Sequence, residues 1–140
     1  MSSNWRFFLH LIWATKGREP LIAEAEEAVL RRSWKISLAE NQVIPHAIGV
    51  MPDHVHFVVS VPPKIAVADV VRLLKGASSH AVNHVGTRSS SGAFAWQSQY
   101  GVLTFGERSL PRVIAYVENQ RQHHAANTIW PTLERITDDT

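Results

Sequence analysis

The sequence contains no cysteine in its 140 residues. This absence excludes a disulfide framework, a thiol nucleophile and any zinc cluster built on cysteine ligands. Tyrosine is also rare, with two residues. No apolar run approaches the roughly 20 residues that a membrane-spanning helix needs, and the first residues lack the layout of a signal peptide. We therefore expect a cytoplasmic protein without a membrane segment.

Positive charge is only slightly in excess of negative charge. The 14 Lys and Arg residues against 12 Asp and Glu leave a formal net charge of +2, although the calculated pI is about 9.3. The excess is concentrated between residues 64 and 121, where seven basic and three acidic residues give a net charge of +4. This segment could contact a polyanion, but its charge alone identifies no partner.

The length and the 45% apolar content are sufficient for one domain with its own core. The hydrophobic patterns predict strands at 5–15, 43–50, 54–61 and within 94–105, and helices at 20–41, 66–85 and 109–124. This order predicts an α+β fold, a ferredoxin-like antiparallel sheet (β-α-β-β-α-β) with two helices on one face. An added C-terminal helix could cover part of the other face. Pro45 predicts an edge or an irregularity in its strand.

Two histidines, His54 and His56, stand at alternate positions in the second strand of the predicted hairpin. Because residues i and i+2 of a strand share a face, both imidazoles can reach one divalent ion. The alternative is a pair of half-buried histidines without a ligand. If Val50 pairs with His54, His46 lies opposite Val58 on the same face as a neighbour of the pair.

A second candidate site residue, Tyr116, lies in the last predicted helix. Gln120 and His123 follow four and seven residues later, so the three side chains share one stripe of the helix. A phenol has a pKa near 10, so only about one tyrosine in a thousand is ionised at neutral pH. As a nucleophile Tyr116 would need a charged neighbour or a metal-polarised electrophile. The alternative is a tyrosine that only packs.

The histidine pair and the tyrosine helix together indicate a catalytic site more strongly than either does alone. A metal ion on His54 and His56 could polarise a phosphate while Tyr116 attacks it. The amide oxygen of Gln120 is a hard neutral ligand that could complete the coordination. Mg²⁺ and Mn²⁺ prefer oxygen ligands, and this ligand set would leave positions for phosphate oxygens and water.

Five short segments form a recognisable set in the chain. They are Ile12–Lys16 with Arg18 and Pro20, Gly49–Phe57, Leu74–Ser79, Ala95–Gln97 with Tyr100 and Gly101, and Tyr116–His124. The Asp-His-Val-His and Tyr-x-x-x-Gln motifs are specific in combination. In this order the sequence resembles the HUH-type single-domain tyrosine transposases of the insertion-sequence-200-like group, where U stands for a bulky apolar residue.

The resemblance implies a role for each motif residue. Members of this family cut and rejoin single-stranded DNA at the ends of a mobile element and recognise hairpins near those ends. By analogy His54 and His56 bind Mg²⁺ or Mn²⁺, Gln120 is the third ligand, and Tyr116 forms a 5′-phosphotyrosine bond that frees a 3′-OH. The resemblance also implies a homodimer, often with the tyrosine helix of one subunit completing the site of the other.

Four residues of the helix at 66–85 are candidate DNA contacts: Arg72, Lys75, Ser78 and Ser79. The alternative for these four is a solvated helix face. The transposase domain is expected to cover residues 1–124. The tail at 125–140 does not match the family pattern and has no assigned role.

Two hypotheses stand beside an active transposase. One is an inactive or domesticated nucleic-acid-binding relative with the same fold, and the intact His-x-His and Tyr-x-x-x-Gln motifs favour the active enzyme over it. The other is a ferredoxin-like binding domain with a structural metal. A structural site would be expected to close its coordination with more His or Cys ligands.

Overall fold

The computed structural model describes residues 5–85, 93–125 and 131–134, and the structural statements below concern these residues. The strands are β1 (Phe8–Ala14), β2 (Ile44–Val50), β3 (His54–Ser60) and β4 (Gly101–Phe105). The helices are α1 (Glu24–Glu40), α2 (Val67–Val85), α3 (Leu110–Glu118) and α4 (Gln120–Ala125). Short 3-10 helices are η1 (Lys16–Arg18), η2 (Glu107–Ser109) and η3 (Pro131–Glu134). Within the described ranges no helix is long and apolar enough to cross a membrane.

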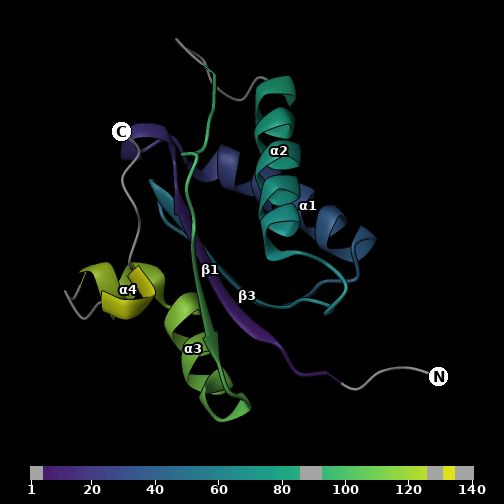
Figure 1. Cartoon of the computed structure of the whole chain (residues 1–140). Coiled ribbons are helices and arrows are strands. Elements are labelled where there is room, and N and C mark those ends of the chain that lie inside the picture. The colour runs from purple at the N-terminus through teal and green to yellow at the C-terminus, as the bar shows by residue number, and fades with distance from the viewer. Residues whose placement is uncertain (1–4, 86–92, 126–130, 135–140) are drawn as a thin grey trace.

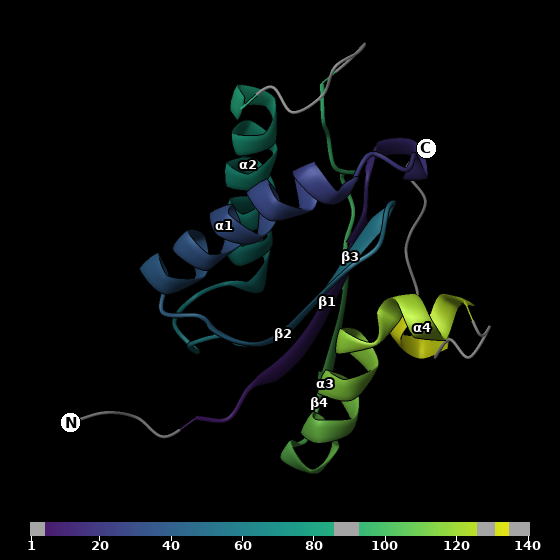
Figure 2. The same ribbon diagram turned by 180° about the vertical axis from the view of Figure 1, so that it is seen from behind.

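The strands form one antiparallel sheet in the order β2-β3-β1-β4, with β1 and β3 in the centre. Two β-α-β units around a β2–β3 hairpin produce this order. The predicted ferredoxin-like α+β fold is therefore confirmed. Helices α1 and α2 lie together on one side of the sheet, and α3 and α4 lie on the other (Figure 1, Figure 2).

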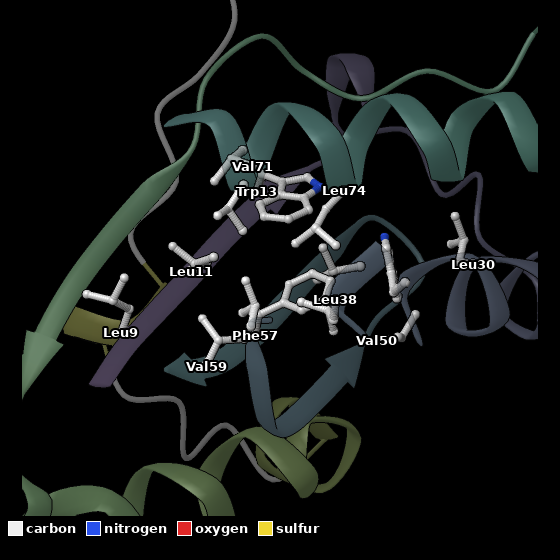
Figure 3. Packing of buried hydrophobic residues seen from close by; sticks show 14 of the residues in the cluster. Leu9, Leu11, Trp13, Leu30, Leu38, Val50, Phe57, Val59, Val71 and Leu74 are labelled. Carbon is white, nitrogen blue, oxygen red and sulfur yellow. The ribbon is translucent and has the colours of Figure 1, made fainter. Parts of the chain in front are cut away.

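The main core lies between the sheet and the layer of α1 and α2 (Figure 3). Val71 and Leu74 of α2 and Trp13 of β1 are buried there. Trp34 of α1 packs edge to face on Phe57 of β3, with ring centroids 4.8 Å apart. Burial of one large apolar side chain contributes about 1.5–3 kcal/mol. This layer therefore fixes the strands that carry the candidate site on their opposite face.

Strand β3 presents two different faces. Val55, Phe57 and Val59 belong to the main core. His54 and His56 point to the opposite face, where the ring of His56 meets the ring of a tyrosine from α3. The alternation follows from the two-residue period of a strand, as the sequence analysis predicts.

A smaller apolar cluster attaches α3 to the face that carries the histidines. Val113, Tyr116 and Val117 of α3 pack there with Ala47 of β2 and Val58 of β3. The predicted added helix therefore does cover part of the face opposite α1 and α2.

The close approach of α3 depends on Gly49, which pairs with His56 across the β2–β3 ladder. A Cβ atom at Gly49 would lie 2.3 Å from the carbonyl oxygen of Val117 and 3.0 Å from Cγ of Gln120. A methyl group cannot occupy that space unless the helix moves. Gly49 therefore allows the helix that carries Tyr116 to lie directly beside the histidine pair.

The β2–β3 hairpin differs in one detail from the predicted pairing. Near the turn the ladder is one residue out of the predicted register, so Ala47 rather than His46 lies opposite Val58. The register shifts between Pro45 and Ala47, because Pro45 has no N–H for a regular ladder. The irregularity predicted at Pro45 is thus confirmed, and His46 instead lies with Nε2 2.8 Å from the Ser60 hydroxyl.

The last predicted helix is divided in two. Helix α3 ends at Glu118 and α4 begins at Gln120, and Asn119 between them has φ −106° and ψ 29°. Ser109 has helical backbone angles and makes no side-chain cap, because η2 leads directly into α3. The division places the predicted nucleophile Tyr116 and the predicted ligand Gln120 on successive helices.

We expect Gly49→Ala to lower the free energy of unfolding by about 1–3 kcal/mol, the usual cost of forcing extra volume into a packed contact. Gly76→Ala is the matched control, because no atom lies within 4 Å of a Cβ at that position in α2. It should instead stabilise the helix by about 0.5–1 kcal/mol. Urea denaturation of both variants measures the difference. Equal stability of Gly49→Ala and the native chain would contradict the steric role of Gly49.

Candidate metal and nucleophile site

The histidine pair at the start of β3 is almost fully buried, with 2% of His54 and none of His56 exposed. Nδ1 of His54 lies 2.7 Å from the carboxylate of Asp53, which accepts its hydrogen. Burial alone would lower the pKa of His54, but the hydrogen bond to Asp53 and the negative charges of Asp53 and Glu134 outweigh burial and raise it. The hydrogen bond from His54 also lowers the pKa of Asp53. Asp53 thereby holds the ring with Nε2 turned toward Glu134, 3.3 Å away.

A third histidine, His10 of β1, supports His56 from the neighbouring strand. Nε2 of His10 lies 2.8 Å from Nδ1 of His56, and His10 is 1% exposed. Burial, assisted by His56, lowers the pKa of His10 to about 3. Burial also lowers the pKa of His56. When His10 accepts the hydrogen on Nδ1 of His56, the lone pair of Nε2 is available to a metal ion.

Tyr116 reaches the histidine pair from α3. The side chain is buried, and its ring centroid lies 6.3 Å from that of His56. The ring of His123 stacks on it at 4.6 Å. The hydroxyl of Tyr116 donates a hydrogen bond to Oε2 of Glu134 at 2.5 Å. Tyr116 therefore points toward the site of His54 and His56 within its own chain.

Gln120, the predicted third ligand, is buried at the start of α4. Its amide nitrogen donates to the carbonyl oxygen of Tyr116 at 3.3 Å, and its Oε1 lies 3.2 Å from Nε2 of His124. The ring of His124 in turn lies 5.1 Å from that of His54. Gln120 thus borders the histidine cluster, with His124 between its amide oxygen and the pair on β3.

Glu134 of η3 connects these residues, although the sequence analysis left the tail without a role. Its Oε1 lies 3.3 Å from Nε2 of His54, 3.2 Å from Nε2 of His56 and 3.4 Å from Nε2 of His124. Burial acts to raise the pKa of Glu134, but the close imidazoles of His54 and His56 and the hydrogen bond from Tyr116 hold it far below its usual range. The carboxylate therefore stays charged among the three imidazoles.

The donor set fits a divalent ion. Nε2 of His54 is buried and makes no hydrogen bond of regular geometry. One ligand atom each from His54, His124 and Glu134 lie within 4.8 Å of one another. Two ligands of one ion lie at most about 4.2 Å apart, twice the usual metal–ligand distance of about 2.1 Å, so only small shifts separate these atoms from a common ion. Imidazole nitrogens with a carboxylate and an amide oxygen form a mixed site that suits an ion such as Mn²⁺ when further oxygen ligands can join.

The candidate DNA contacts on α2 border a cavity of about 560 Å³, which Arg72, Lys75, Ser79 and Trp96 line. Arg72 is exposed and pairs with Asp69 of its own helix. Lys75 donates to two backbone carbonyls of the segment before β4, at 2.9 and 2.8 Å. The cavity thus combines cationic groups with an aromatic ring, which suits a nucleic-acid strand.

Ser78 has a different place from the other three residues. It is fully buried, its hydroxyl accepts a hydrogen bond from Nε1 of Trp96 at 3.0 Å, and it donates to the carbonyl of Lys75. Ser78 therefore positions Trp96 and does not itself line the cavity. Trp96 also pairs with Thr15, whose amide donates to the carbonyl of Asp53. The cavity and the histidine site consequently lie near the same end of the sheet, on its opposite faces.

A ferredoxin-like sheet that carries a His-x-His pair and faces a helical tyrosine has the architecture of the HUH-type tyrosine transposases. The family model described as "Transposase IS200 like" matches residues 3–120. The chain belongs to this family, whose activity is to cut and join DNA.

Known proteins agree with this assignment. The chain is 31% identical over 114 residues to the ISDra2 transposase TnpA of Deinococcus radiodurans, which covers 79% of this chain and 81% of that protein. A crystal structure of a protein from D. radiodurans R1 assigned as a transposase has a TM-score of 0.66 at 31% identity and covers 86% of this chain and 95% of its own. A REP-associated tyrosine transposase bound to a REP hairpin has a TM-score of 0.68 at 15% identity, with 100% and 94% covered, and supports the fold.

Three residues of the cluster escaped the sequence analysis. His10 interrupts an apolar strand, and its position on the face opposite Trp13 was the available signal. His124 follows Gln120 by four residues, a spacing that shares a helix face. Glu134 gave no signal, because its approach to the site depends on how the tail folds back.

We expect His10→Ala to weaken Mn²⁺ binding by about 10–100-fold, the usual effect of removing a group that orients a metal ligand. His10→Gln should restore part of the affinity, because its amide oxygen can accept the hydrogen on Nδ1 of His56. His80→Ala, an exposed histidine of α2, is the control. Isothermal titration calorimetry with Mn²⁺ measures the affinities. An unchanged affinity in His10→Ala would refute the orienting role.

Proposed function

We propose that this protein is a transposase that cleaves and rejoins single-stranded DNA at the ends of a mobile element. Tyr116 is the nucleophile, and His54, His56 and Gln120 hold a divalent metal, Mg²⁺ or Mn²⁺. The observation that carries the proposal is the link from the Tyr116 hydroxyl through Glu134 to Nε2 of both histidines. This link supports the proposal, because one carboxylate contacts both the proposed nucleophile and the proposed metal ligands.

In the proposed reaction the phenol oxygen of Tyr116 attacks a phosphodiester phosphorus. A bond forms between phosphorus and the tyrosine oxygen, and the bond to the 3′-oxygen breaks. The proton that the phenol loses balances the one that the 3′-oxygen gains, which leaves a 5′-phosphotyrosine and a free 3′-OH. A bound divalent ion would draw charge from a phosphate oxygen. Because the energy of the phosphodiester is kept, another 3′-OH can reverse the step and join new ends without ATP.

A hydrogen bond to Glu134 orients the hydroxyl of the proposed nucleophile. The Tyr116 hydroxyl has to lose its hydrogen as the new bond forms, and a free phenol gives it up only near pH 10. In the structure this hydrogen points to Oε2 of Glu134. The stack of His123 on the phenol ring limits its rotation. These contacts orient Tyr116 before DNA binds.

Single-stranded DNA with end hairpins is the proposed substrate. Arg72, Lys75 and Ser79 border a cavity beside Trp96, and Trp96 pairs with Thr15, whose amide donates to the carbonyl of Asp53 next to His54. A similar fold is seen in a transposase bound to a REP hairpin. The homodimer implied by the family stays a prediction that sedimentation of the purified chain would check, and the cytoplasmic location also stays a prediction.

Tyr116→Phe should abolish a covalent protein–DNA adduct, with a loss of more than about 1,000-fold because the nucleophile is removed. The assay uses Mn²⁺ and single-stranded oligonucleotides of the DNA that flanks the coding sequence. A 3′ label follows the fragment that stays on the tyrosine, and a denaturing gel separates the adduct. Tyr100→Phe, the variant of the only other tyrosine, must still form the adduct.

An adduct that survives in Tyr116→Phe would refute the assignment of the nucleophile. Absence of an adduct on every flanking end, in a chain that still binds these oligonucleotides, would favour the inactive or domesticated relative. A mixture of the Tyr116→Phe and His56→Ala variants tests whether the tyrosine acts in the site of its own chain or in the site of a partner chain. Because Tyr116 lies in its own chain's site, the mixture should not restore the adduct.

Arg72→Ala should weaken binding of a fluorescent single-stranded hairpin. It should also make the dependence of log affinity on log salt less steep by about 0.7, the contribution of one phosphate contact in single-stranded DNA. Arg32→Ala on α1 makes the same charge change at an exposed position outside the cavity. Fluorescence anisotropy at several NaCl concentrations gives both slopes. Identical slopes in the two variants would show that Arg72 contacts no phosphate.

A further inference from the structure

Glu134 stands out because three imidazole nitrogens converge on one of its oxygens. Nε2 atoms of His54, His56 and His124 lie 3.2–3.4 Å from Oε1, and they come from β3 and from α4. The carboxylate oxygen is nearly equidistant from the three nitrogens. One ligand atom each from His54, His124 and Glu134 lie within 4.8 Å of one another, so the oxygen is itself a member of a possible metal site.

The position of Glu134 is fixed by its neighbour in the chain. Leu133 is 2% exposed and packs in the apolar cluster of α3, β2 and β3 together with Val117. The short η3 helix continues from Leu133 directly to Glu134. The carboxylate therefore does not reach the site from a solvated position, since an apolar anchor holds it there.

The surroundings of Glu134 call for a cation. Its side chain is 10% exposed, and a buried carboxylate is costly unless a positive charge or a metal compensates it. Among the contacts described within residues 5–85, 93–125 and 131–134, none joins Glu134 to a lysine or an arginine. The groups around it are imidazoles and the Tyr116 hydroxyl. A divalent ion shared with these imidazoles would also compensate the charge of the carboxylate.

We propose that Glu134 is a ligand of the metal ion and the anionic member of its coordination shell. This inference rests on the proposed metal site and adds a residue from the tail to it. Two histidines and the amide of Gln120 are neutral ligands, whereas hard ions such as Mg²⁺ and Mn²⁺ favour carboxylate oxygens. Oε2 of the same carboxylate holds the Tyr116 hydroxyl. Glu134 therefore couples metal binding to the position of the nucleophile.

The test is Mn²⁺ binding to the full, DNA-free chain, followed by the electron paramagnetic resonance signal of free Mn²⁺. Glu134→Gln keeps the size of the side chain and removes its charge, and it should weaken Mn²⁺ binding by about tenfold or more. Glu118→Gln makes the same change at an exposed position of α3 and should leave the affinity unchanged. Circular dichroism verifies that both variants are folded.

Glu134→Asp gives a second measurement if Glu134→Gln does not fold. The shorter carboxylate should keep more affinity than a chain with Glu134→Ala. An unchanged Mn²⁺ affinity in Glu134→Gln or Glu134→Ala would overturn the proposal. A higher affinity would overturn it too, because it would identify Glu134 as a group that obstructs the site.

The covalent-adduct assay separates this proposal from the proposed function. In one outcome Glu134→Gln loses Mn²⁺ binding while the native chain forms no adduct on any DNA. That outcome would support Glu134 as a ligand and refute the transposase activity. A normal adduct at native Mn²⁺ concentrations in Glu134→Gln would support the activity and refute the ligand. Tyr116→Phe should retain Mn²⁺ binding, because its hydroxyl is not a ligand in the proposal.

Discussion

The two-residue period of β3 is the constraint on which the rest of the structure depends. One strand has to supply apolar side chains to the main core and imidazoles to the site. Val55, Phe57 and Val59 are buried against α1 and α2. Because side chains alternate along a strand, His54 and His56 must lie on the opposite face of the sheet. A shift of one residue in the register would turn the apolar set toward α3 and the histidines into the main core. The stability of the main core therefore also fixes the orientation of the site.

Helices α3 and α4 cover the face of the sheet that carries the histidines, and they pack there against polar as well as apolar side chains. Helix α3 approaches closely only because Gly49 has no side chain. This approach puts the phenol of Tyr116 beside the imidazole of His56 and encloses polar atoms that water would otherwise satisfy. The enclosed groups satisfy one another through a chain of contacts that runs from His10 through His56 and Glu134 to Tyr116. These contacts therefore hold the side chains of the site in place within the chain itself.

The sequence was sufficient for the parts of the molecule that follow local rules. The alternation in β3 and the helical period of α2 predicted their buried faces, and the order of elements predicted the sheet. It was insufficient where contacts join distant segments. The partner of His56 lies on β1, 46 residues earlier in the chain, and Glu134 lies 78 residues later. The division of the last helix at Asn119 also follows from tertiary packing, because its sequence continues the helical stripe.

Strand β1 shows how one element can join the two halves of the proposed function. Its residues Leu11 and Trp13 lie in the main core, while His10 reaches across to His56 on the other face. Just beyond its end, Thr15 donates its amide to the carbonyl of Asp53 and pairs with Trp96 beside the cationic cavity. A displacement of this strand end would therefore alter both the carboxylate that orients His54 and the ring that lines the cavity. Because these contacts run through the main chain, a DNA strand in the cavity and a phosphate at the histidines would be held by one rigid unit. Rigid placement of both groups is what an in-line attack by a tyrosine requires.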